Sequence, residues 1–261
     1  MKNSAQGSQT VARAIGLLRL VSSRAKEGMR VQEIVDAGEL SRPTVHRLLS
    51  ELVECGLLMR SSERRFFLGQ FAYELGISAA SHFHLKDICA PFLDAVAQET
   101  GDTAFLVARS GADSFCLDRK SGSFPVKVFT VEIGSRQPLG VGAAGLALLS
   151  WLPEAAFTQV MERNAPQLSK YAGLSLERLS EAVVNAREKG YSKISDFAVA
   201  GVSGVGVPVL DFTGAPVVAL SVATVTARMT PGHEERVVRV LKAESIKLRE
   251  VLQKNMVSAS H

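Results

Sequence analysis

Apolar residues between positions 45 and 53 recur at the spacing of a single helix face. They follow the order i, i+3, i+4, i+7 and i+8, which predicts a helix over residues 42–54 that is buried along one stripe. The stripe consists of Val45, Leu48, Leu49, Leu52 and Val53. The opposite face is polar and partly cationic, and it carries Arg42, Pro43, His46, Arg47 and Ser50.

The ends of this helix have clear local signals. Ser41 or Arg42 suits the N-cap, and Pro43 suits the first turn, where a missing N–H costs nothing. Gly56 is placed to end the helix. The N-terminal half of the polar face is therefore expected to be free to meet a polyanion.

A short hairpin with a basic turn is predicted directly after the helix. The segments LLMR and FFLG read as its strands, and the turn SSERR between them holds Arg64 and Arg65. A basic turn of this kind suits contact with phosphates or with a DNA minor groove.

Two further helices precede this unit. Apolar spacing from Val11 to Val21 predicts the first, and VQEIVDAG predicts a short second helix that ends near Gly38. Three helices and a hairpin form a winged helix-turn-helix, which indicates DNA binding. Three-helix units with scattered arginines also serve as dimerisation or protein-docking domains, and that alternative stays open here.

In the DNA-binding interpretation, the recognition helices of two subunits enter successive major grooves of a pseudopalindromic double-stranded operator. The hairpin arginines then lie on the backbone. The candidate DNA-contacting residues are Arg13, Ser41, Arg42, Pro43, Thr44, His46, Arg47, Ser50, Arg60, Arg64 and Arg65.

The rest of the chain alternates between helix and strand patterns. Residues 69–101 read as helix almost throughout, interrupted around Ser81 to His84 and bent or restarted near Pro91. The next segments, TAFLVARS, DSFCLDRK and VKVFTVEI, are β-rich and resemble an antiparallel meander. Helices are expected at about 142–151, 153–163 and 176–189, the last with Ser175 as cap and Gly190 as stop.

Strands then return as YSKIS, VSGVGVPVLD and PVVALSVATV, and Thr230 caps a closing helix that runs to about Lys254. The predicted fold class is α+β, with helices packed on an antiparallel sheet. The expected organisation is a DNA-binding domain over residues 1–70, a linker helix over 71–84 and a second domain over 85–261.

Composition agrees with two domains. The chain has 261 residues, of which 46% are hydrophobic, and a formal charge of +4. Residues 1–75 hold 11 Lys and Arg against 8 Asp and Glu, whereas residues 76–261 hold 19 against 18. Three scattered cysteines without metal-ligand spacing indicate reduced thiols, and neither a signal peptide nor a membrane span is recognisable. We therefore expect a cytoplasmic protein.

The segment LGVGAAG at residues 139–145 matches the GxGxxG pattern of dinucleotide sites. The preceding EIGSRQPL is no buried central strand, so this interpretation is rejected. Glycines that open an apolar helix leave the N–H groups of Gly142, Ala143 and Ala144 available to an anion such as a carboxylate. Close packing of this helix on a sheet explains the glycines equally well.

The sequence lacks the enzyme signatures that some of its segments resemble. GVSGV lacks the last glycine of a nucleophile elbow, HEERV lacks the second histidine of a zincin, and no P-loop occurs. The chain is therefore not expected to be an enzyme, and no cofactor or metal is expected.

With these pieces in view, the chain resembles IclR-type transcriptional regulators over nearly its whole length. The resemblance rests on VARAIGLLRLV, LSRPTVHRLLSELVECGLL, FFLGQFAYELG, PLGVGAAGLALLSWLP, REKGY and GVGVPVLDFTGAPVVALSV, which occur in the family's order. It implies an N-terminal winged helix-turn-helix, a helical linker and a C-terminal GAF-like domain that binds a small effector. It also implies a homodimer or a dimer of dimers on DNA. Association with a membrane is not expected.

The resemblance further implies that the turn from Gly142 to Ala144 holds the effector's carboxylate. Other pocket positions of the family fall on Ile194, Gly204, Ser221 and Ala223, and Val126 and Phe129 would supply a wall. Three of these four positions lack the polar groups expected in sensors of small keto acids, so the effector is predicted to be an organic acid with an apolar or aromatic body.

Asp196 lies two residues beyond Ile194, on the same face if the strand continues, and would replace the missing acid. A solvated carboxylate in a loop is an equally good interpretation of Asp196.

For the whole chain, one alternative function is a small-molecule-binding module or enzyme with an N-terminal dimerisation unit. Another is a protein-interaction scaffold, which fits the glycine-lined helix start poorly.

Overall fold

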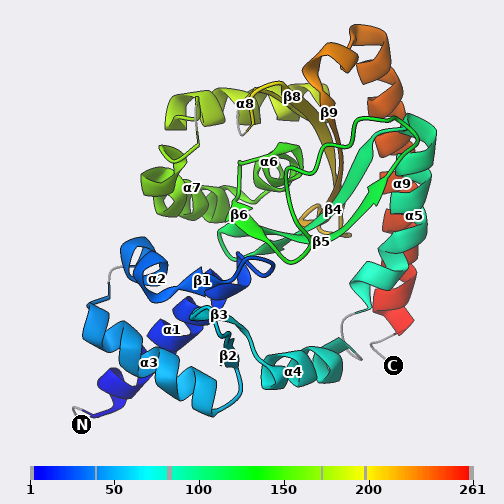
Figure 1. Ribbon diagram of the computed structural model, residues 1–261. Coiled ribbons are helices and arrows are strands. Elements are labelled where there is room, and N and C mark those ends of the chain that lie inside the picture. Colours follow the sequence, from blue (N-terminus) through cyan, green and yellow to red (C-terminus); the bar gives the residue numbers. More distant parts are fainter. Residues whose placement is uncertain (1–2, 39, 81–83, 172, 197–198, 259–261) are drawn as a thin grey trace. The chain divides into compact units, whose positions relative to one another are not determined.

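The computed structural model describes residues 3–38, 40–80, 84–171, 173–196 and 199–258. The chain divides into two compact units, Met1–His84 and Leu85–His261 (Figure 1). Each unit has its own hydrophobic core. The predicted interruption at residues 81–83 lies outside the described residues.

The N-terminal unit contains the predicted three helices and hairpin. Leu17, Ile34, Leu49 and Phe66 are buried in a core shared by these elements. One short strand, β1, was not predicted, and it pairs Met29 with Phe66. The elements are α1 (Asn3–Ser22), β1 (Met29–Arg30), α2 (Val31–Ala37), α3 (Arg42–Glu54), β2 (Leu58–Arg60), β3 (Arg65–Leu68) and α4 (Gln70–Ala80), with strand order β1-β3-β2.

Helix α3 follows its sequence signals closely. Its N-cap is Ser41 and Pro43 lies in its first turn, although the Ser41 hydroxyl contacts Thr44 Oγ1 at 2.9 Å instead of a backbone N–H. The predicted apolar stripe is buried, except that Val53 is only partly buried. The polar face therefore remains outside.

The C-terminal unit is built on a six-stranded antiparallel sheet with strand order β6-β5-β4-β9-β8-β7. Because side chains alternate along a strand, Phe105 and Val107 face one core, whereas Ala104 and Leu106 face the other. The strands are β4 (Thr103–Ser110), β5 (Asp113–Ser121), β6 (Arg136–Pro138), β7 (Ser192–Ser195), β8 (Val202–Leu210) and β9 (Pro216–Val225).

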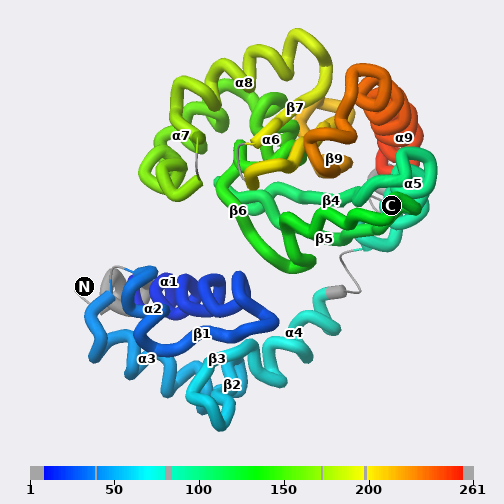
Figure 2. Tube along the Cα trace, turned by 45° about the horizontal axis from the view of Figure 1, so that its top comes forward, coloured from blue at the N-terminus to red at the C-terminus, as the bar shows by residue number. Residues whose placement is uncertain are grey.

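Helices cover both faces of this sheet. Two long helices, α5 and α9, lie side by side on one face, and α6 packs on the other face with α7 and α8 beyond it (Figures 1 and 2). The helices are α5 (Leu85–Thr100), α6 (Ala143–Ser150), α7 (Glu154–Leu168), α8 (Leu176–Lys189) and α9 (Pro231–Ser258), with a 3₁₀ turn η1 (Thr226–Arg228) before α9.

Helix α5 is continuous through Pro91, so of the predicted bend or restart the restart does not occur, and Cys89 and Leu93 on either side are buried. One prediction for this unit was wrong. The segment VKVFTVEI forms no strand. Residues 122–135, here called the strap, connect β5 and β6 irregularly and attach through isolated bonds, such as Gly134 N–H to Cys116 O at 2.8 Å.

Within the described residues, none of the helices is long and apolar enough to span a membrane.

Candidate functional sites

The exposed face of α3 and the β2–β3 hairpin form a cationic groove. Arg42 and His46 from α3 line it together with Arg60 and Arg64 from the hairpin. The sequence-predicted contacts Ser41, Pro43, Arg47 and Ser50 are exposed on or next to the same helix, and Thr44 is partly exposed. The structure thus brings most of the predicted DNA-contacting residues to one surface.

Four residues of the groove were missed from the sequence, namely Arg30, Val31, Gln32 and the acidic Glu63. Arg30 precedes α2, and its backbone N–H donates to Glu33 Oε2 at 2.7 Å. This bond is the largest cause that lowers the pKa of Glu33, with Arg65 and Arg24 adding to it. The signal that could have identified Arg30 is a basic residue at the start of α2, the helix before the recognition helix.

Arg64 and Arg65 differ in role although they are neighbours. Arg64 adopts a positive φ of 60° at the hairpin turn and is exposed. Arg65 instead turns inward, where its Nη1 donates to Gly28 O at 3.1 Å and lies 3.5 Å from Glu33. Arg65 therefore holds β3 against the start of α2 and does not line the groove. Arg13 is exposed on α1 and does not line the groove either.

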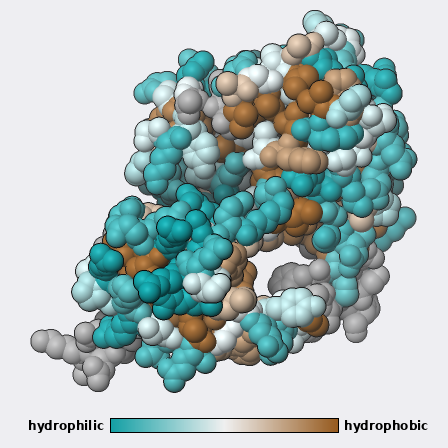
Figure 3. All heavy atoms as spheres, viewed as in Figure 1, coloured by the Kyte–Doolittle hydropathy of each residue, from teal (hydrophilic) through white to brown (hydrophobic). Residues whose placement is uncertain are grey.

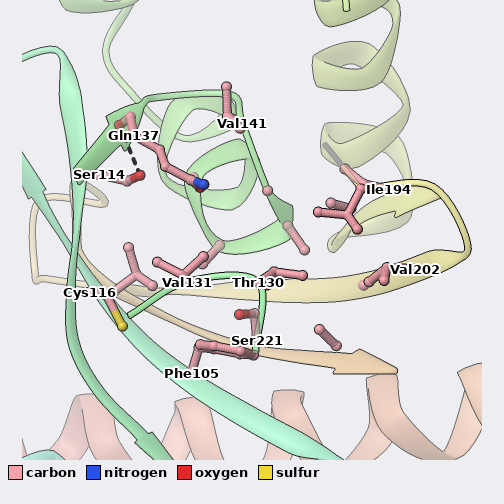
Figure 4. Close-up of a pocket in the computed structure, with 18 of the residues that line it drawn as sticks. Phe105, Ser114, Cys116, Thr130, Val131, Gln137, Val141, Ile194, Val202 and Ser221 are labelled. Atoms are coloured by element: carbon pink, nitrogen blue, oxygen red, sulfur yellow. Dashed lines mark hydrogen bonds between the residues drawn. The ribbon is translucent and has the colours of Figure 1, made fainter. Parts of the chain in front are cut away.

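A second candidate site is a pocket between the sheet and the start of α6. It encloses about 790 Å³, including its open mouth, and the strap contributes Thr130 and Val131 to its lining (Figure 4). None of the described residues that line it carries a charged side chain. Ile194, Val199 and Val202 make the side formed by β7 and β8 apolar.

The N-terminus of α6 opens into this pocket. Gly142 is the N-cap with φ 75° and ψ 155°, and the first-turn N–H groups that follow have no acceptor within the helix. The same segment is also packed tightly, because a Cβ on Gly206 would lie 2.7 Å from Ala143 O. Ser192 Oγ donates to Ala143 O at 2.6 Å and fixes the helix start to the sheet. Close packing thus occurs at Gly206, while the open side at Gly142 faces the pocket.

Seven of the ten predicted effector positions line the pocket. The three others, Val126, Phe129 and Asp196, do not. Val126 and Phe129 are exposed on the strap, and the Phe129 ring lies under the Arg119 guanidinium at 3.9 Å. The seven that line the pocket are Gly142, Ala143, Ala144, Ile194, Gly204, Ser221 and Ala223.

The expected position of Asp196 assumed that β7 continues, but this strand ends at Ser195. Asp196 has a φ of 58°, and its Oδ1 accepts from Gly201 N–H at 2.6 Å. Its carboxylate is exposed and stabilises the turn between β7 and β8.

Several polar groups of the pocket were missed from the sequence. Ser114 and Cys116 lie on β5, where alternate residues point inward, and Gln137 lies on the three-residue strand β6. Burial raises the pKa of the Cys116 thiol to about 11, so this group is uncharged at neutral pH. Burial is also the first cause that raises the pKa of Tyr171, followed by Asp113.

Comparison with known proteins places the chain in a family. Residues 10–62 match the IclR helix-turn-helix domain, and residues 77–249 match the C-terminal domain of bacterial IclR transcriptional regulators. The chain belongs to the IclR family of transcriptional regulators, whose members bind DNA through the first domain and a small effector through the second. These relatives are regulators and not enzymes.

Individual relatives are distant but cover most of the chain. The transcriptional regulator XynR of Escherichia coli is 29% identical over 85% of this chain and 88% of its own. An IclR regulator from Alicyclobacillus acidocaldarius is 26% identical with a TM-score of 0.71, covering 93% and 98%. An IclR homologue from Microbacterium hydrocarbonoxydans, complexed with 4-hydroxybenzoate, is 21% identical with a TM-score of 0.68, covering 92% and 98%.

Proposed function

We propose that this protein is a sequence-specific regulator whose operator binding is modulated by a small monocarboxylic acid with an apolar or aromatic body. The observation that carries this proposal is the pocket at the start of α6, which joins free helix N–H groups to an uncharged and largely apolar lining. The helix start offers a partial positive charge of about +0.5 to a carboxylate.

The second support is a buried polar group aimed into the same cavity. Ser221 is 5% exposed, and it lines the pocket. Figure 4 shows this hydroxyl pointing into the pocket from β9. A hydroxyl in this position can donate a hydrogen bond to an oxygen of the bound acid.

The lining also limits the charge of the effector. A dicarboxylate would place a second negative charge against Phe105, Ile194 and Val202, with no cationic side chain among the described lining residues to meet it. One carboxylate and an apolar body fit these surroundings. The 4-hydroxybenzoate bound by the Microbacterium homologue is an acid of this kind.

For DNA binding, we propose that α3 enters the major groove while the arginines beside it meet phosphates. Two copies are needed to read a pseudopalindrome. Hydrophobic residues are interspersed with hydrophilic ones on the visible face of the protein (Figure 3). We assign contact between copies, in a homodimer or a dimer of dimers, to apolar side chains exposed on α1 and α4, which are Val11, Ile15, Phe71, Tyr73, Leu75 and Ile77.

A thermal-shift screen of the full-length protein tests the ligand class. We expect benzoate, 4-hydroxybenzoate or phenylacetate to raise the melting temperature more than glyoxylate, pyruvate or succinate at equal concentration. Stabilisation by the small keto acids alone, or by the dicarboxylate alone, would contradict the proposed effector class.

Fluorescence anisotropy with the DNA upstream of the protein's own gene tests the DNA-binding surface. Arg47→Ala should weaken operator binding by about 5- to 100-fold without changing acid binding. Arg239→Ala removes an exposed arginine from α9 and serves as the charge-matched control, with operator affinity unchanged. Equal losses in the two variants would count against α3 as the recognition helix.

A further inference from the structure

The side-chain amide of Gln137 is a polar group of the pocket that restricts the chemistry of the effector. Gln137 lies on β6 opposite Ser114 of β5, and the Ser114 hydroxyl donates to Gln137 O at 3.1 Å. This bond fixes the backbone of Gln137. Its side-chain amide has no hydrogen-bond partner in the described chain and points into the pocket (Figure 4).

The amide lies next to the helix start that is proposed to hold the carboxylate. Gln137 Oε1 is 3.6 Å from the position that a Cβ on Gly142 would occupy, and among the described residues beyond the adjacent ones in the chain it is the sole neighbour of that position within 4 Å. A carboxylate against the N–H groups of α6 would therefore have its adjacent carbon within reach of the Gln137 amide. The apolar residues Ile194 and Val202 lie away from Gln137, on the other side of the pocket (Figure 4).

A primary amide offers both a donor and an acceptor, and a carboxylate can use only the donor. A ligand with a plain methylene beside its carboxylate would displace water from this amide and replace none of its hydrogen bonds, which costs free energy. A hydroxyl group at that carbon satisfies donor and acceptor together, and an oxo group satisfies the donor.

We infer that Gln137 is a specificity-determining residue and that the effector is an apolar acid with a hydroxyl or oxo group on the carbon next to its carboxylate. This inference rests on the proposed acid-binding function. It assigns the hydrophobic body of the acid to the β7 and β8 side of the pocket and the substituted carbon to the β6 side.

Isothermal titration calorimetry on the full-length protein tests it with phenylacetate, both enantiomers of mandelate, and phenylglyoxylate. These acids share a ring and a carboxylate and differ at the carbon next to the carboxylate. The protein should bind phenylglyoxylate or one mandelate enantiomer about tenfold more tightly than phenylacetate, the value expected for one additional hydrogen bond.

The variant Gln137→Met keeps the length of the side chain and removes its hydrogen-bonding groups. It should reduce the preference to within about twofold, because mandelate and phenylglyoxylate lose a hydrogen bond whereas phenylacetate affinity does not fall. Gln159→Met, on the exposed side of α7, is the matched control and should preserve the preference. Thermal unfolding of both variants checks that they are folded.

Four outcomes would overturn the inference in distinguishable ways. Equal affinity of the native protein for all four acids would show that it has no preference for a hydroxyl or oxo group. A preference that persists in Gln137→Met would show that Gln137 does not determine it. Equal weakening of all four acids in that variant means that the amide contacts the carboxylate instead. Binding of none of the acids contradicts the proposed function as well.

Discussion

Gly142 has a backbone conformation that only glycine adopts readily. Its φ of 75° and ψ of 155° would cost an alanine about 1–3 kcal/mol. The space around its missing Cβ is nevertheless open to the pocket, with Gln137 Oε1 at 3.6 Å as the nearest neighbour. Position 142 thus combines a conformational requirement with direct access to the ligand.

Gly142→Ala is therefore expected to weaken binding of the acid effector by at least about tenfold, because either the first turn of α6 shifts or the new methyl group occupies ligand space. Operator affinity without effector should stay unchanged. Calorimetry with the acid and anisotropy with operator DNA measure the two effects.

Gly214→Ala provides the control for strain alone. Gly214 has a φ of 83° in the turn between β8 and β9, and apart from its chain neighbours no described residue lies within 4 Å of its missing Cβ. This variant should be destabilised without losing effector affinity. If both glycine variants lost the acid equally, the pocket at α6 would not be the binding site.

Local sequence signals predicted the roles of single residues well where the hydrogen-bond partner lies a few positions away in the sequence. Ser175 caps α8 by accepting the Arg178 N–H, and Gly190 ends that helix in the left-handed conformation, both as predicted. The inward turn of Arg65 could not be predicted, because its partners Gly28 and Glu33 lie more than 30 positions away in the sequence.

At the scale of elements, a buried charge cluster joins the start of β4 to η1 and α9. Asp102 has a side chain that is 1% exposed, and it accepts from Arg228 Nε at 2.8 Å and contacts His233 Nε2 at 2.6 Å. Arg228 also stacks on Phe124 at 3.9 Å and donates to Thr100 O. The carboxylate therefore connects the start of β4 to two segments that follow it by 126 and 131 positions.

Asp102→Ala is expected to lower the free energy of unfolding of the protein by about 2–3 kcal/mol, because it leaves the guanidinium and the imidazole without their acceptor. The loss is smaller than for a fully buried pair, since the Arg228 side chain is 29% exposed. Urea unfolding followed by circular dichroism measures it.

Asp94→Ala removes another carboxylate of the same unit and is the control. Asp94 pairs with Lys120 at 3.1 Å, but the two side chains are 45% and 37% exposed. A loss of less than about 1 kcal/mol is expected there. Similar losses in the two variants would mean that burial of Asp102 has no energetic consequence.

Among the elements, sequence reasoning succeeded where long apolar patterns are buried. Helix α3 buries one repeating stripe, whereas strands β4, β8 and β9 are buried in continuous runs. The strand predicted for VKVFTVEI was wrong because its β-branched and aromatic residues are typical of a strand, yet Val126, Phe129 and Ile133 are exposed and the segment forms no strand in the described chain. Gln137 was missed because β6 is too short to show periodicity.

For the whole molecule, regulation requires that the acid bind with different affinity when operator DNA is bound and when it is free. The two binding equilibria form a closed thermodynamic cycle. If the acid changes the operator dissociation constant by some factor, the operator must change the acid dissociation constant by the same factor. The direction of the change does not affect this equality.

We expect a factor of about 5–150, the usual range for coupled sites. Anisotropy titrations of operator with and without saturating acid give one side of the cycle, and calorimetry of the acid with and without saturating operator gives the other. Gly142→Ala should make operator affinity insensitive to acid, whereas Arg47→Ala should weaken both operator titrations in parallel. If neither ligand changes the dissociation constant of the other although both are shown to bind, the pocket does not regulate operator binding. The protein would then bind DNA and an acid independently.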